Sequence, residues 1–142
     1  MTAKSLELKI VSKQWVELPD IINQYSKIAK KYLAVPMLKS NAKQFLFLQS
    51  LCFFANNDLV GAKKSIQMNA IEDPSYDGSM EMELCQAMVQ HIEDANRDGF
   101  NVAVSQYNNL KPLQRAHTSI IVKIKEIYLP DEEDFGGQQV EA

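Results

Sequence analysis

The sequence predicts an all-α fold built from antiparallel helical hairpins that end in a C-terminal helical bundle. Apolar residues recur at three- and four-residue spacing over most of the chain, which is the period of a helix that buries one face. No segment shows the sustained alternation of apolar and polar residues expected of a strand. Turns of a few residues separate the helical segments, as in a tetratricopeptide-like repeat.

Composition and charge limit the function classes. A chain of 142 residues fits one domain, and 46% hydrophobic with 23% charged residues is ordinary for a soluble globular protein. The net charge of −3 argues against general nucleic-acid binding, which usually needs a basic surface. Cys52 and Cys85 lie inside apolar helical patterns, which favours buried thiols in a reducing compartment. With no apolar run of membrane-spanning length and no signal peptide, we expect a cytoplasmic protein.

The first two apolar patterns differ in strength. Leu6, Ile10 and Trp15 form a short helical stripe that is too brief to be stable alone. We interpret this stripe as the edge of an incomplete stack, which another repeat would cover, and so expect the natural chain to extend further toward its N-terminus. A stronger stripe over residues 18–32 predicts a full helix, which should end before Pro36 because the residue before proline disfavours the α conformation.

Residues 38–55 predict the central helix of the fold. Apolar side chains surround this segment on nearly all sides, so it should pack against several neighbours: Phe45, Leu46, Phe47, Leu48, Leu51, Cys52, Phe53 and Phe54. Asp58 is placed to cap the next helix, which should end near Asp73.

These two helices match the tetratricopeptide spacing. Ser50 and Ala62 are small where two helices would cross, while Phe53 and Ile66 are large where the helices would interlock. The pair over residues 80–110 keeps the helix–turn–helix order but lacks the small residues. We therefore expect a repeat stack that passes into a closing bundle.

Three further helices are predicted in the second half of the chain. Ser79 is expected to cap the first of them, Asp98 the second, and Pro112 to open the last. The resulting organisation is one helical domain over residues 1–130, followed by a flexible acidic tail over residues 131–142.

The sequence contains no convincing catalytic or metal-binding pattern. His91 and His117 have no cysteine or carboxylate at metal-ligand spacing and are interpreted as structural or solvent-facing. Asp73, Asp77 and Glu81 faintly resemble a calcium loop, but the required glycine and terminal glutamate are missing, so we expect helix capping and solvation instead. We expect no metal, no cofactor and no enzymatic activity.

Two groups of charged residues point to binding of other macromolecules. One group is acidic and lies at helix junctions: Asp58, Glu93, Asp94, and the run Asp131, Glu132, Glu133 and Asp134. The other group is basic and lies earlier in the chain: Lys4, Lys9, Lys39 and Lys43. A chain with this charge asymmetry can bridge two partners of opposite charge.

Three stretches resemble a known family. The runs VPMLKSNAKQFLFLQSLCFFANNDLVGAKKSIQ, IEDANRDGFNVAVSQY and TSIIVKIKEIYLPDEEDF are similar to the C-terminal half of the soluble NSF attachment proteins of the alpha/beta type. The resemblance extends from about Lys4 to Phe135. Its most specific parts are the PxLKxxAKxF helix, the SQY motif, and the IxxKIK helix that leads directly into the acidic run.

The resemblance implies an adaptor that links a syntaxin-type SNARE four-helix bundle to NSF, a hexameric AAA+ ATPase that pulls the bundle apart. It implies peripheral membrane association through the SNAREs. The positions implied to bind the ATPase are Asp58, Glu93, Asp94, Asp131, Glu132, Glu133, Asp134 and Phe135. The positions implied to bind the SNARE bundle are Lys4, Lys9, Lys39 and Lys43.

The chain departs from the family pattern at several places. Gln90 stands where the family has an acid, Ser40 where it has a tyrosine, and Phe135 where it has a near-terminal leucine that stimulates the ATPase. The sequence GGQQVEA follows Phe135, where the family chain would end. The given sequence does not contain the family's N-terminal half, with its apolar membrane loop and further SNARE-binding lysines. If the natural chain starts at Met1, we expect weak SNARE affinity.

The alternative function is a tetratricopeptide-like module that binds peptides for another ATPase or chaperone. That function requires a concave groove with convergent asparagine and lysine side chains, which the sequence does not clearly supply.

Overall fold

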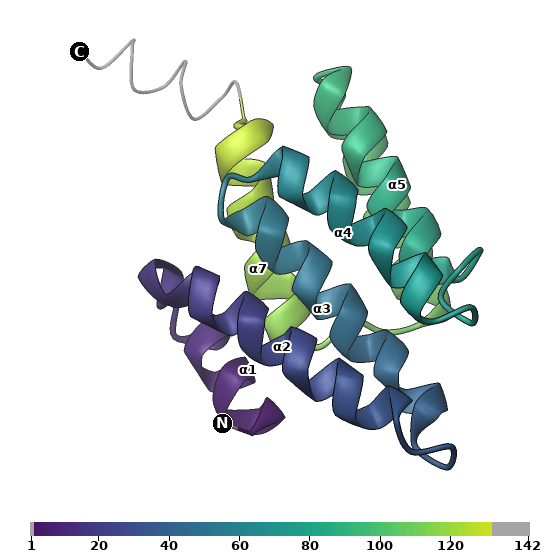
Figure 1. Ribbon diagram of the computed structural model, residues 1–142. Coiled ribbons are helices and arrows are strands. Elements are labelled where there is room, and N and C mark those ends of the chain that lie inside the picture. Colours follow the sequence, from purple (N-terminus) through teal and green to yellow (C-terminus); the bar gives the residue numbers. More distant parts are fainter. Residues whose placement is uncertain (1, 132–142) are drawn as a thin grey trace, which may run out of the picture.

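The computed structural model of the chain describes residues 2–131, and all regular secondary structure in this part is helical (Figure 1). Its elements are α1 (Ala3–Val11), α2 (Leu18–Leu33), α3 (Ala42–Ala55), α4 (Leu59–Glu72), α5 (Met80–Glu93), α6 (Arg97–Leu110) and α7 (Arg115–Tyr128), with short 3₁₀ helices at Trp15–Glu17 and Lys39–Asn41. Successive helices from α1 to α6 pack on one another as antiparallel hairpins, and α7 packs on α3 and α1, so the predicted all-α fold is confirmed.

Helix α3 is the centre of the core, as predicted. Eleven of its fourteen residues are buried, because apolar side chains point from it in every direction. It packs against α2, α4, α5 and α7. The helix starts later than the sequence predicted, since residues 39–41 form a 3₁₀ turn before the α-helix begins.

The crossing of α3 and α4 contains the predicted small residues and, in addition, a buried polar network. Ser50 and Ala62 are both fully buried. The Ser50 hydroxyl lies 2.9 Å from the Ser65 hydroxyl and accepts a hydrogen bond from Asn69 Nδ2 at 3.2 Å. Asn69 Nδ2 also lies 3.3 Å from the Leu46 carbonyl oxygen. These bonds satisfy polar groups that would otherwise be costly to bury.

The starts of α4 and α5 follow the sequence prediction, and those of α6 and α7 depart from it. Asp58 and Ser79 cap α4 and α5, accepting from backbone N–H groups at 2.8 and 3.1 Å. The prediction of Asp98 as the cap of α6 is wrong, because Asn96 Oδ1 accepts from the Gly99 N–H at 2.9 Å. The last helix does not open at Pro112 either, since it begins at Arg115 behind a capping box formed by Gln114 and His117.

The short apolar stripe at the start of the chain belongs to the core. Leu6 and Ile10 are fully buried, with α1 packed against α7 and α2. Our interpretation of this stripe as an uncovered edge is therefore wrong for these two residues. In this segment, Leu8 and Val16 point outward and are exposed to solvent, by 63% and 90%.

The hairpins give the molecule two opposite ends. The turn between α3 and α4, the end of α5 and the end of α7 lie near the top of Figure 1, whereas the loop between α2 and α3 lies at the lower right. Asp58, Glu93, Asp94 and Asp131 lie at the first of these ends and Lys39 and Lys43 at the second, whereas Lys4 and Lys9 lie on α1.

Candidate partner-binding surfaces

The end of α7 is fixed firmly to the rest of the bundle. The Tyr128 hydroxyl donates a hydrogen bond of 2.8 Å to the Phe54 carbonyl oxygen at the end of α3. The Arg97 guanidinium, at the start of α6, donates to the Leu129 carbonyl oxygen. Arg97 also lies 4.0 Å from the Asp131 carboxylate, which is the first residue of the acidic run. The run therefore begins at a junction of three helices.

Asp58 lies at the same junction. It caps α4 four residues after Phe54, whose carbonyl oxygen accepts from the Tyr128 hydroxyl. Burial, together with the nearby negative charge of Asp58, raises the pKa of that hydroxyl to about 12. A Cβ atom at Gly61 would lie 2.3 Å from Asp58 Oδ2, so the first turn of α4 needs a glycine to accommodate this cap. Asp58 therefore caps α4 while remaining partly exposed to solvent.

Glu93 and Asp94 complete the group at the end of α5. The Glu93 carboxylate pairs with Lys63 Nζ at 2.6 Å, and Lys63 lies in α4 about one turn after Asp58. The Asp94 carboxylate accepts from Gln90 Nε2 at 2.8 Å, so Gln90 orients the neighbouring acid. We name these four described acids the acidic end: Asp58, Glu93, Asp94 and Asp131.

The four residues of the acidic end lie at helix junctions of the same end of the bundle, and two of their four carboxylates have a cationic neighbour. Lys63 faces Glu93 and Arg97 faces Asp131. The sequence did not reveal these pairs, because each joins residues that are at least thirty positions apart in the chain. The remaining predicted positions of this group lie outside the described residues: Glu132, Glu133, Asp134 and Phe135.

The predicted basic residues do not form a single cluster. Lys39 is exposed in the 3₁₀ turn and Lys43 is half-buried in the first turn of α3, so these two share the end opposite the acidic end. Lys4 is exposed on α1 and lines a cavity of about 280 Å³ with Arg115. Lys43 lines a different cavity, on the other side of the start of α7, with His117.

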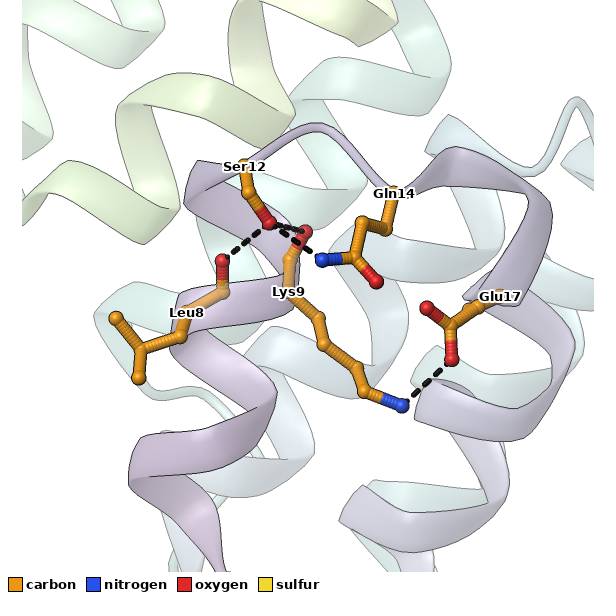
Figure 2. Close-up of polar contacts among 5 residues, drawn as sticks. All are labelled: Leu8, Lys9, Ser12, Gln14 and Glu17. Atoms are coloured by element: carbon orange, nitrogen blue, oxygen red, sulfur yellow. Dashed lines mark hydrogen bonds and ion pairs between the residues drawn. The ribbon is translucent and has the colours of Figure 1, made fainter.

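Lys9 is held by an intramolecular ion pair. Its Nζ atom lies 2.6 Å from Glu17 Oε1, and Figure 2 shows the two side chains pointing toward one another. Beside them, the Ser12 hydroxyl donates to the Leu8 carbonyl oxygen at 2.7 Å and accepts from Gln14 Nε2 at 2.9 Å. The structure therefore assigns Lys9 a local role in the turn after α1.

Glu81 is buried, and our expectation that it is solvated is wrong. Its side chain is only 5% exposed, and Oε2 accepts from the Tyr107 hydroxyl at 2.6 Å and from Lys111 Nζ at 2.9 Å. The sequence contained a signal, because Glu81 precedes the buried Cys85 and Met88 by one and two helical turns and so shares their face. The carboxylate lines a cavity of about 360 Å³.

Replacing Tyr107 with phenylalanine is expected to destabilise the fold by about 1.5–3 kcal/mol, the usual loss for a hydrogen bond to a charged group. Burial alone would raise the pKa of the Glu81 carboxyl, but hydrogen bonds from Tyr107 and Lys111 outweigh it and hold that pKa below its usual 4.5. The stabilisation is therefore present above pH 4.5 and is lost as the pH falls through the lowered pKa.

Urea unfolding of this variant and of the wild type, at neutral pH and in acid, measures the effect. Tyr32→Phe is the matched control because Tyr32 packs its ring on Phe45 from the half-buried end of α2. Equal stability of Tyr107→Phe and wild type at neutral pH would contradict the assignment of this buried network.

His117 makes the stability of the fold sensitive to mild acid. Its ring stacks on Phe47 with centroids 5.4 Å apart, and its Nδ1 accepts from the Gln114 N–H at 3.3 Å. Burial lowers the pKa of His117 below its usual 6.5, partly opposed by the negative charge of Glu81. The unfolded chain therefore takes up this proton more readily, so stability present above pH 6.5 is lost as the pH falls toward the lowered pKa.

The measurement is the urea midpoint as a function of pH from roughly 7.5 to 5. We expect the midpoint to fall in the wild type and to fall less steeply in His117→Gln, which keeps a side-chain acceptor for the Gln114 N–H. An identical slope in both proteins would show that another group titrates.

The cysteines and the other acid considered for catalysis or metal binding are buried within the described part of the chain. Cys52 and Cys85 are free, buried thiols, and burial raises the pKa of Cys85 to about 12, which makes it a poor nucleophile. Asp73 is buried rather than solvated and accepts from the Ser75 N–H at 3.0 Å. Residues 2–131 contain no group of histidine, cysteine and acidic side chains that could hold a metal ion.

The fold and the two charged ends define a helical-hairpin protein whose surfaces suit other macromolecules. The family model for soluble NSF attachment protein matches residues 3–128, which is most of the chain. The chain therefore belongs to the soluble NSF attachment protein family.

Individual relatives are similar at modest identity. The alpha-soluble NSF attachment protein of Mus musculus is 29% identical over 80% of this chain and 38% of its own length. That of Saccharomyces cerevisiae is 25% identical over 93% of this chain and 44% of its own length, and the beta-soluble NSF attachment protein of Bos taurus is 24% identical over 92% and 44%. The chain thus spans less than half the length of these relatives.

Proposed function

We propose that this protein is an adaptor that links SNARE complexes to the AAA+ ATPase NSF and promotes SNARE disassembly in vesicle fusion and intracellular protein transport. Membership of the soluble NSF attachment protein family supports this proposal. The proposed location is the cytoplasmic face of membranes, reached through the SNAREs, and the chemistry belongs to the ATPase rather than to this chain. None of the helices in residues 2–131 combines the length and apolar character needed to cross a membrane.

The observation that supports the proposal is the placement of four acids at the helix junctions of one end of the bundle. Asp58, Glu93 and Asp94 come from the α3–α4 and α5–α6 junctions, and Asp131, which follows α7, lies 4.0 Å from Arg97 at the start of α6. A cluster of carboxylates from several helices gives a partner with basic residues one continuous contact. We assign this surface, continued by Glu132, Glu133 and Asp134, to the ATPase, with Phe135 as its apolar contact.

The opposite end is assigned to the SNARE bundle. Lys39 and Lys43 lie at the start of α3, and α3 alone separates them from Asp58. Two partners bound at the two ends would be held apart by a rigid, fully packed helix. Lys4, beside the start of α7, is a weaker candidate for the same role because it lies on a separate part of the surface.

The lysines are expected to contribute unequally to SNARE binding. Lys43→Ala should weaken binding to a soluble SNARE bundle by about fivefold, whereas Lys9→Ala should change it by less than about twofold, because Lys9 already pairs with Glu17 at 2.6 Å. Titration of the immobilised bundle with each variant measures both values. A larger effect at Lys9 than at Lys43 would overturn the assignment of this surface.

The second candidate function is a tetratricopeptide-like module that binds peptides for another ATPase or chaperone. One observation favours it, since Asn41, Lys43 and Lys111 line the cavity of about 360 Å³ that also contains Glu81. Binding of isolated acidic peptides with no response to NSF or to SNARE bundles would support this alternative over the adaptor.

A further inference from the structure

Two hydrogen bonds hold the end of α7 against the ends of other helices. The Tyr128 hydroxyl donates to the carbonyl oxygen of Phe54 at 2.8 Å, near the end of α3. The guanidinium of Arg97 donates to the carbonyl oxygen of Leu129, the residue at which α7 ends. The acidic run begins two residues later, at Asp131. These two bonds therefore fix the point from which the run leaves the bundle. We name them the α7 clamp.

The side chain of Arg97 stabilises the end of α7 rather than its own helix. Arg97 is the first residue of α6, where a positive charge is unfavourable because the N-terminus of a helix already carries partial positive charge. At the end of α7 the same charge is favourable, because the last carbonyl groups of a helix carry partial negative charge. The bond to Leu129 also supplies a donor to a carbonyl group at an end where the helix offers none.

The contact of Arg97 with Asp131 is weaker than its contact with Leu129. The charged groups of Arg97 and Asp131 lie 4.0 Å apart, and their side chains are 33% and 41% exposed. An ion pair that is open to solvent contributes little, whereas a hydrogen bond from a charged donor to a part-buried carbonyl group contributes more. Arg97 thus neutralises the acidic run only slightly. Its larger effect is to hold the backbone from which the run begins.

We propose that Arg97 and Tyr128 are positioning residues for NSF docking, because the α7 clamp orders the start of the acidic run before NSF binds. This inference rests on the proposed adaptor function. A segment that is already ordered binds more tightly, since the partner does not have to immobilise it. Each further backbone residue that must be ordered on binding lowers the affinity about fivefold to thirtyfold.

The clamp predicts an effect opposite in sign to that of charge alone. Loss of the Arg97 charge makes the acidic end more negative, so a basic partner would bind more tightly if only charge mattered. The clamp predicts instead that Arg97→Met weakens NSF recruitment at least about fivefold, since at least one more residue must be ordered on binding. Tyr128→Phe changes no charge and should weaken recruitment in the same direction.

Amide hydrogen exchange tests the clamp without any partner. The Leu129 N–H donates to the carbonyl oxygen of Lys125 at 2.9 Å in the last turn of α7. In Arg97→Met and in Tyr128→Phe this turn should exchange about fivefold faster, the factor that corresponds to one lost hydrogen bond. The first turn of α7, where the Thr118 N–H donates at 3.0 Å, should exchange as in the wild type. Unchanged exchange of the last turn in both variants would overturn the clamp.

Capture of NSF on immobilised SNARE bundles tests the positioning role. The matched control is Lys63→Met, which removes a charge from the same end of the bundle by breaking the 2.6 Å pair with Glu93 but leaves both clamp bonds in place. It should recruit NSF as well as the wild type or up to about fivefold more tightly. Tyr32→Phe, which removes a tyrosine hydroxyl from α2, should recruit NSF like the wild type.

The outcomes separate this inference from the adaptor proposal. Tighter NSF binding by Arg97→Met, or recruitment by both clamp variants equal to that of the wild type, would overturn the positioning role and leave the adaptor proposal standing. Absence of recruitment by the wild type itself would contradict the adaptor proposal, and the positioning role with it, even if hydrogen exchange shows that the clamp holds α7.

Discussion

Neutralising the acidic end together with the acidic run is expected to weaken NSF recruitment by roughly 100-fold, the combined effect of seven modest ionic contributions. The variant replaces Asp and Glu by Asn and Gln, which preserves shape: Asp58→Asn, Glu93→Gln, Asp94→Asn, Asp131→Asn, Glu132→Gln, Glu133→Gln and Asp134→Asn. Asparagine at position 58 still caps α4, so the fold should persist. Single replacements should show little effect, because exposed ion pairs contribute about 0–1 kcal/mol each.

The measurement is the affinity of NSF for SNARE bundles loaded with each variant, at two salt concentrations. Recruitment by the wild type should weaken with salt, since the screening length is roughly 8–10 Å under physiological conditions. A control variant neutralises exposed acids around the α4–α5 turn: Glu72→Gln, Asp77→Asn and Glu83→Gln. Unchanged recruitment by the seven-site variant, with the fold intact by circular dichroism, would show that NSF binds elsewhere.

Replacing Phe47 with alanine is expected to destabilise the protein by about 3–5 kcal/mol, the usual loss for a fully buried phenylalanine. Phe47 is 1% exposed, and its ring centroid lies 5.5 Å from that of Tyr107 and 5.4 Å from that of His117. It thus joins α3 to both α6 and α7. Because a domain of this size is stable by only about 5–15 kcal/mol, this one change should remove a large part of its stability.

Urea unfolding gives this difference directly, with Phe53→Ala as the control at a half-buried position of the same helix. The control should cost less, because its ring is not enclosed on every side. A loss below about 1 kcal/mol for Phe47→Ala would mean that α6 and α7 do not close the bundle on α3.

The fold could be predicted from the sequence where the periodic pattern was unambiguous. The apolar surroundings of α3 predicted its central place, and Ser50 and Ala62 predicted the helix crossing, since only small side chains allow close approach. The start of α6 could not be decided, because Asn96 and Asp98 are both good capping residues. The start of α7 could not be predicted from Pro112, because it depends on a capping box between Gln114 and His117.

The charged surfaces were only partly predictable. The acids lie at one end of the bundle because each of them is at a helix junction, and junctions gather at the ends of hairpins. The order of the helices already implies this arrangement. The ion pairs could not be predicted, since Lys63 and Glu93 are thirty residues apart and come together only through the packing of α4 on α5. Glu81 was misjudged because a charged side chain was assumed to be solvated, although its helical position placed it among buried residues.

The most direct test of the adaptor account is capture of NSF on immobilised SNARE bundles, with and without this protein. The account predicts that NSF is retained only when the protein is present, and that ATP hydrolysis then releases the SNAREs. It predicts little retention with the seven-site acidic variant, although that variant still binds the bundle. Equal retention of NSF with and without the protein would contradict the account.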